Sequence, residues 1–315
     1  MSERRTARHW AEIGETTSVA GIRLLCAVRR HFGRGVFRLC AWPVVLLHWL
    51  GNARARHASL EYLRRLHAHA GVFAREPGWR ESLHHFRVFA DTLLDKILAL
   101  GGEYPLRQVR KERDVMLRML EAGRGGVIVT AHVGCLELCQ ALADASPGFR
   151  MTALVHTRHA ERFNRMLARL GSDKVRLLQV DDLGPAVAAQ IGERVERGEF
   201  VAIAGDRVPI GGGRHVFADF LGRPAPFPVG AYVLAAALHC PLFTMACLHE
   251  GDGYVVRFET FAERVALPRG AREAALADHA ARFAQWLETQ LRAAPFDWFN
   301  FFPFWNQVPD VRQVH

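Results

Sequence analysis

A short apolar run at residues 127–131 constrains the fold of this 315-residue chain more than any other segment. Gly125 and Gly126 precede the run, and residues 136–143 behind it have the apolar spacing of a helix. A run of this length between glycines predicts a short buried strand. His132 then lies where the strand ends, in the turn that leads into the helix.

The same alternation continues along the chain. We expect strands at residues 127–130, 151–155, 175–179, 201–204, 242–248 and 254–258, and helices at 160–170, 185–197 and 229–238. Strands that alternate with helices predict an α/β fold, with a mostly parallel central sheet flanked by helices. Ligands of such sheets bind beyond the carboxyl ends of the strands, where both His132 and Asp206 fall.

Glu137 follows His132 by five positions. Five residues of one regular helix turn through about 500 degrees, so the two side chains meet only if His132 precedes the helix and Glu137 lies in its first turns. A carboxylate there accepts a hydrogen bond from one imidazole nitrogen and leaves the other basic toward a substrate hydroxyl. The alternative is a hydrogen-bonded histidine at a strand end beside an unrelated surface carboxylate.

This motif resembles a known one. His132-x4-Glu137 is similar to the His-x4-Asp/Glu motif of the lysophospholipid and glycerolipid acyltransferase superfamily, and its setting Ala-His-Val-Gly-x-x-Glu-Leu resembles the branch of bacterial lipid A biosynthesis (late) acyltransferases. The later blocks at residues 200–207 and 217–230 and the aromatic tail at 295–305 are similar too. The likeness runs from about residue 21 to 305 and departs from the family at Cys135, Leu136 and the loop 211–215, which puts the substrate in doubt more than the reaction.

The resemblance implies transfer of an acyl group from an acyl thioester, on acyl carrier protein or coenzyme A, to a hydroxyl or amine of a membrane lipid or glycolipid. The thioester is a co-substrate, and no cofactor is expected. His132 is the expected general base and Glu137 its orienting partner, with backbone N–H groups near Gly134 and the side chain of Arg207 as oxyanion donors. Arg158 is a candidate phosphate ligand, and Asp206 is either a partner of the catalytic residues or an acceptor-binding group.

The positive charge is concentrated at the N-terminus. Residues 1–65 hold twelve Arg and four Glu, a balance of +8 out of +9 for the whole chain. Within them, residues 36–50 are apolar but shorter than the ~20 residues that span a bilayer. We therefore expect a basic interfacial segment at 1–65 in front of a single catalytic domain at 66–315, held at the cytoplasmic face of the inner membrane by anionic lipids. The alternative is an amphipathic helix buried against that domain.

The cysteines and histidines favour no other chemistry. Cys135 near His132 suggests a thiol nucleophile, but six scattered cysteines in apolar surroundings are more typical of reduced, buried thiols. Sixteen histidines form no metal-binding pattern, so no metal is expected. The loop at 211–213 lacks the lysine and spacing of a phosphate-binding loop.

A second class of function stays open at this point, which is an inactive module that binds a membrane surface or nucleic acid. The pI of about 9.8 permits nucleic acid. However, the basic residues flank an apolar stretch and form no known recognition motif, so lipid is the better partner and no nucleic acid is expected. The sequence leaves open the identity of the acceptor, the acyl chain length and the oligomeric state.

Overall fold

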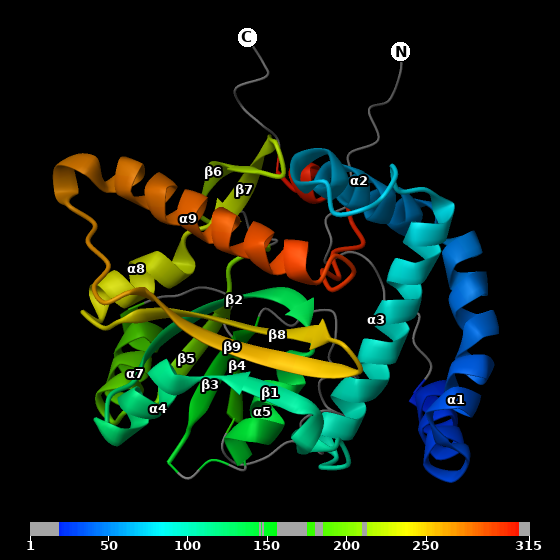
Figure 1. Cartoon of the computed structure of the whole chain (residues 1–315). Coiled ribbons are helices and arrows are strands. Elements are labelled where there is room, and N and C mark those ends of the chain that lie inside the picture. The colour runs from blue at the N-terminus through cyan, green and yellow to red at the C-terminus, as the bar shows by residue number, and fades with distance from the viewer. Residues whose placement is uncertain are drawn as a thin grey trace.

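The computed structural model describes residues 19–144, 146, 148–155, 175–179, 185–209 and 213–308. A seven-stranded sheet lies at its centre with helices on both faces (Figure 1). The strand order is β1-β9-β8-β2-β5-β3-β4, and only the pair β8 and β9 is antiparallel. The predicted α/β class with a mostly parallel sheet is therefore confirmed.

The strands of the sheet are β1 (Val109–Glu112), β2 (Gly126–Gly134), β3 (Met151–Val155), β4 (Val175–Gln179), β5 (Phe200–Ala204), β8 (Leu242–Glu250) and β9 (Gly253–Ala262). The helices are α1 (Val19–Gly51), α2 (Ala53–Ala70), α3 (Trp79–Leu100), α4 (Asp114–Glu121), α5 (Leu136–Asp144), α7 (Pro185–Glu196), α8 (Gly230–Ala237) and α9 (Arg272–Ala293). All six predicted strands are present. The helix predicted at 160–170 lies outside the described residues.

Three strands escaped the sequence analysis for physical reasons. The edge strand β1 buries only Val109, so it has no apolar run to reveal it. A separate hairpin of β6 (His215–Phe220) and β7 (Arg223–Pro228) has proline at every second position of β7. Proline has no N–H to donate to a neighbouring strand, so its presence argues against a strand. In a two-stranded sheet, however, each strand has a neighbour on one side only, and proline is tolerated on the other side.

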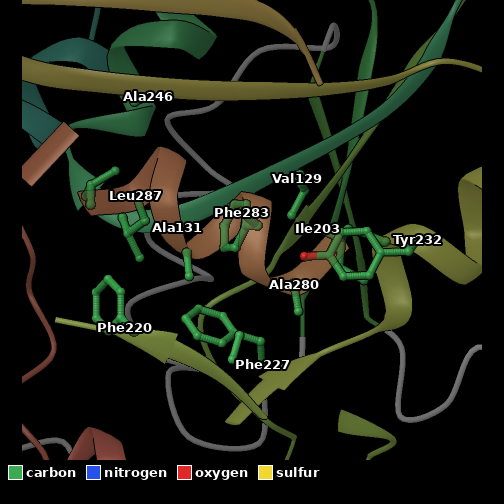
Figure 2. Packing of buried hydrophobic residues seen from close by; sticks show 14 of the residues in the cluster. Val129, Ala131, Ile203, Phe220, Phe227, Tyr232, Ala246, Ala280, Phe283 and Leu287 are labelled. Carbon is green, nitrogen blue, oxygen red and sulfur yellow. The ribbon is translucent and has the colours of Figure 1, made fainter. Parts of the chain in front are cut away.

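The central strand β2 packs against a different layer on each face. Val127, Val129, Ala131 and Val133 belong to a core that α2, α7, α8, α9 and the hairpin complete. Figure 2 shows Val129 and Ala131 facing Phe283 of α9 and the aromatic rings of the hairpin. Ile128 faces the second core, built with α1, α3, α4 and α5. Burial on both faces explains the continuous apolar run that the sequence displays.

The N-terminal helices pack on this framework. In Figure 1, α1 lies beside α3 at one end of the sheet. Among the side chains of α1 that the structure describes, from residue 31 on, Phe37, Ala41 and Val45 are buried on the inner side and seven large apolar residues are exposed on the outer side. They are Phe32, Val36, Leu39, Trp42, Val44, Leu47 and Leu50. The helix is therefore partly buried, as one alternative held, and also carries an apolar outer surface. The domain boundary at residue 65 stays a prediction.

Among the described helices, none alone is long and apolar enough to cross a membrane. Residues 35–51 of α1 and helix α2 meet that condition only as a pair, and they are bent by 92° at their junction.

Candidate active site

His132 lies near the end of β2 and is held by a carboxylate from the neighbouring strand. Its Nδ1 is 2.8 Å from Oδ1 of Asp206, and its backbone N–H donates to Oδ2 of the same residue at 3.0 Å. Asp206 follows β5, which pairs with β2 in parallel so that Thr130 is opposite Ala204. His132 lies two residues after Thr130 and Asp206 lies two residues after Ala204, so the two residues are also side by side.

Asp206 is buried and its oxygens are taken by four donors. Besides the two groups of His132, Trp298 Nε1 donates to Oδ2 at 3.1 Å and Asn300 Nδ2 donates to it at 3.0 Å. The sequence left two roles open for Asp206, and this geometry decides between them. A carboxylate with no exposed surface does not bind an acceptor, so it is the partner of the imidazole.

The bond from Asp206 also fixes the tautomer of His132. An ionised carboxylate accepts only, so Nδ1 carries the hydrogen and Nε2 keeps its lone pair. The His132 side chain is 38% exposed. Within the described part of the chain no protein group is bonded to Nε2. This nitrogen is therefore available to a ligand as a base.

The expected pairing of His132 with Glu137 is wrong. Glu137 does lie in the first turn of α5, as predicted, but its Oε1 accepts a hydrogen bond from Lys96 Nζ of α3 at 3.1 Å. The reason is that α5 packs against α3, which presents a lysine to the carboxylate. Asp206 is thus the carboxylate bonded to His132, and Glu137 is bonded to Lys96.

The aromatic tail closes over the end of β2. Val133 forms an antiparallel bridge with Trp298, and the N–H of Phe299 donates to the carbonyl of His132 at 3.1 Å. The N–H of Gly134 donates to the carbonyl of Asp297 at 2.8 Å. The tail thereby extends β2 beyond the predicted end at Thr130. It also corrects the expected oxyanion role of Gly134, because that amide already has a partner.

Arg207 follows Asp206 in the chain, and its guanidinium contacts the aromatic tail. Its Nε donates to Asn300 Oδ1 at 2.9 Å, its Nη2 donates to the carbonyl of Phe299 at 3.2 Å, and its guanidinium lies 5.5 Å from the ring centre of Phe302. Burial lowers its pKa to about 10, against the opposing charge of Asp206. Arg207 is thus a fixed cation that ties the tail to the site.

The comparison with known proteins identifies a family. Residues 104–307, more than half of the chain, match the family model described as bacterial lipid A biosynthesis acyltransferase. The chain belongs to this family. The matched range includes His132, Glu137, Asp206 and the tail, and it leaves out Lys96 of α3. No curated protein sequence matches the chain.

The electrostatics of this acyltransferase keep His132 neutral. Partial burial and the positive charge of Arg207 lower the pKa of His132, and Lys96 adds to this, while Asp206 opposes it. Burial disfavours ionisation of Asp206, but His132, its hydrogen bonds and Arg207 outweigh burial and hold the pKa below its usual value. The pair at neutral pH is therefore a neutral imidazole on a charged carboxylate, which is the state a general base requires.

The thiol of Cys135 is unsuited to the role of nucleophile in this acyltransferase. Cys135 is fully buried, and burial together with the neighbouring Glu137 raises its pKa well above the ordinary value. A protonated, inaccessible thiol does not attack a thioester. Among the described residues, no group of three or more His, Cys, Asp or Glu side chains has the arrangement of a metal site.

Three residues of the site were missed in the sequence. Lys96, Trp298 and Asn300 complete the contacts of Glu137 and Asp206. Asp297 and Asn300 are polar residues in an otherwise aromatic tail, and that pattern is a usable signal; Lys96 has none. Arg158, the expected phosphate ligand, lies outside the described residues.

Proposed function

We propose that this acyltransferase moves a fatty acyl group from an acyl thioester to a hydroxyl or amine of a membrane lipid, with His132 as general base and Asp206 as its positioning residue. The observation that carries the proposal is the partly exposed side chain of His132, whose Nδ1 is bonded to a buried carboxylate at 2.8 Å. This arrangement is the one that activates a hydroxyl for attack on a carbonyl in acyl transfer.

In the proposed reaction, Nε2 of His132 takes the proton of the acceptor hydroxyl as its oxygen forms a bond to the thioester carbon. Collapse of the tetrahedral intermediate breaks the carbon–sulfur bond. The imidazolium then returns the proton to the leaving thiolate, so the products are an ester, or an amide from an amine, and a free thiol. Asp206 stabilises the imidazolium during this cycle and keeps the ring in place.

Negative charge that develops on the carbonyl oxygen needs a positive partner. Arg207 and Lys96 are both close enough to His132 to lower its pKa, so their charge acts on the reacting region. We propose that they stabilise the oxyanion electrostatically. Glu137 is then a positioning residue, because it holds Lys96 by the 3.1 Å ion pair.

The acceptor is proposed to come from a membrane on which α1 rests. The exposed apolar side of α1 includes Leu39 and Leu47, with 72% and 69% of their surface accessible. Arginines on and around this helix suit anionic headgroups at the cytoplasmic face of the inner membrane. Monotopic or peripheral attachment fits this surface. Acyl carrier protein is the proposed partner that delivers the acyl group, with acyl-coenzyme A as the other donor.

Mass spectrometry of membrane lipids tests the proposal. Cells that overproduce the wild-type protein are expected to accumulate a lipid heavier by one acyl group, and cells without the gene are expected to lack it. The control is overproduction of His132→Ala, which removes the base. If the His132→Ala variant produces the same lipid as the wild type, the proposed mechanism is wrong. If the purified wild type neither transfers nor hydrolyses an acyl thioester, an inactive binding module is the better account.

A further inference from the structure

A second histidine, at the end of β8, is held in the same way as His132. The N–H of His249 donates to Oδ2 of Asp297 at 2.7 Å, and its Nδ1 is 2.7 Å from Oδ1 of the same carboxylate. In both pairs one aspartate binds the backbone and the ring of one histidine. Asp297 is 2% exposed and His249 is 30% exposed, close to the 0% and 38% of the first pair.

The two imidazoles lie on the same face of the sheet. Side chains alternate along a strand, so His249 shares its face with Met245 and Cys247. His132 shares its face with Ile128, and these three apolar residues belong to one core. Strands β2 and β8 are parallel neighbours, so both histidines lie toward the carboxyl edge where ligands of such sheets bind.

The aromatic tail connects the two pairs. Asp297 bonds to His249, and Phe299, two positions further on, bonds to the carbonyl of His132. Gly134 of β2 is opposite Cys247 of β8, so His249 lies four residues further along the strands than His132. Four residues of a strand rise about 13 Å, which is the offset between the two histidines along the sheet.

Helix α3 joins both pairs to the side of the molecule where α1 lies. Tyr254 packs its ring 4.2 Å from that of His249 and donates its hydroxyl to Asp95 of α3 at 3.0 Å. The next residue, Lys96, acts on the surroundings of His132. One turn earlier, Asp91 of α3 binds Arg38 of α1 at 3.1 Å. Helix α3 therefore contacts α1 on one side and the surroundings of both histidines on the other.

We propose that His249, oriented by Asp297, binds the acceptor lipid through Nε2, which accepts a hydrogen bond from a second hydroxyl or amide N–H of the headgroup. This inference rests on the proposed acyl transfer. With Nδ1 held by the carboxylate, Nε2 has its lone pair free, and within the described residues no protein group bonds to it. His249 thereby selects acceptors that carry two polar groups at the right spacing.

A matched pair of substitutions separates binding from a merely structural role. In His249→Asn the amide nitrogen replaces Nδ1 and keeps the bond to Asp297, but the Nε2 side is lost. In His249→Gln the amide reaches the place of Nε2, but the bond to Asp297 is lost. The acceptor probe is de-O-acylated lipid A in detergent micelles, and the donor is a fatty acyl thioester of acyl carrier protein.

We expect His249→Asn to raise the KM for this acceptor about tenfold while Tm and the KM for the donor change little. His249→Gln is expected to lower Tm and to affect the acceptor KM less. A wild-type acceptor KM in the folded His249→Asn protein overturns the inference. Wild-type protein that transfers no acyl group to any lipid overturns the proposed function instead, so the two failures are distinguishable.

Footprinting of the wild-type protein gives a measurement that does not depend on how the variants fold. Diethyl pyrocarbonate modifies accessible imidazoles, and the exposed His57 of α2 serves as the reference. We expect de-O-acylated lipid A to protect His249 and to leave His57 labelled as before. Equal labelling of His249 with and without the lipid overturns the inference.

Discussion

At the residue scale, the reactivity of His132 depends on the hydrogen bonds at its Nδ1. A buried carboxylate that accepts from four donors is a rigid partner, and we propose that this rigidity keeps the imidazole aimed at the substrate. Burial and the cations Arg207 and Lys96 lower the pKa of the ring, whereas Asp206 raises it. Because the pKa is lowered overall, the imidazole is neutral before the proposed reaction. Asp206 stabilises the imidazolium that would form during it.

Asp206→Asn is expected to reduce kcat by roughly 10² to 10⁴, because an amide either donates toward Nδ1 or imposes the wrong tautomer. Glu137→Gln is the comparison, and we expect a loss of about tenfold or less because Glu137 acts through Lys96. Steady-state kinetics of both purified variants measure the difference. A larger loss in Glu137→Gln than in Asp206→Asn would falsify the assignment of partners.

The pH profile tests the electrostatics. Because the pKa of His132 is lowered from 6.5 and the neutral ring is the active form, the acidic limb of kcat/KM is expected below pH 6.5. Arg207→Gln removes a positive charge that lowers this pKa. The acidic limb should therefore move to higher pH in the variant. A limb that stays in place or moves to lower pH contradicts the proposed influence of Arg207.

At the element scale, the end of β2 depends on a close approach to β8. Gly134 has a φ of 58°, and a Cβ at this position would lie 1.8 Å from the carbonyl oxygen of Cys247. Only glycine permits both the backbone conformation and the contact. The register between the two strands shifts between Thr130 and Gly134, which is where His132 lies. The glycine therefore allows the irregularity at which His132 lies.

Gly134→Ala is expected to destabilise the protein by about 3 kcal/mol or more, because left-handed strain and a backbone overlap add together. Gly123→Ala is the matched control, since Gly123 has a φ of 62° and open space where the Cβ would lie. It should lose only about 1 kcal/mol. Urea unfolding followed by circular dichroism measures both free energies. Equal losses in the two variants count against the close approach.

At the scale of the whole molecule, α1 is both a structural helix and an exposed apolar surface. Phe37, Ala41 and Val45 of α1 are buried in the core. A truncation that removes residues 1–56 would therefore remove core side chains together with the proposed membrane contact. Substitution of the outer residues leaves the core intact. It is therefore a sharper test of membrane binding than truncation.

The double variant Leu39→Glu, Leu47→Glu is expected to reduce co-sedimentation with anionic vesicles several-fold, because it places charge on the apolar side of α1. The control is Leu117→Glu, Leu177→Glu, which changes two exposed leucines on α4 and β4. Both variants should keep acyl thioester hydrolysis in detergent. If the two pairs sediment alike, the membrane contact lies elsewhere on the protein.

The sequence by itself determined the elements that depend on local pattern. Apolar runs and their spacing predicted six strands that the structure contains, the α/β class, and the place of His132 near the end of β2. The reason is that a parallel strand buried on both faces consists of a continuous run of apolar residues. The edge strand β1 has no such run, since only Val109 is buried.

Only the tertiary structure decided the partners of these residues. His132 and Asp206 are 74 positions apart, and they meet because β2 and β5 are neighbours in a register that sets Thr130 opposite Ala204. Glu137, five positions from His132, turns to Lys96 because α5 packs on α3. The pairing of His249 with Asp297 likewise depends on where the tail crosses the sheet. Hydrogen bonds follow proximity in space, and the spacing of residues along the chain does not encode it.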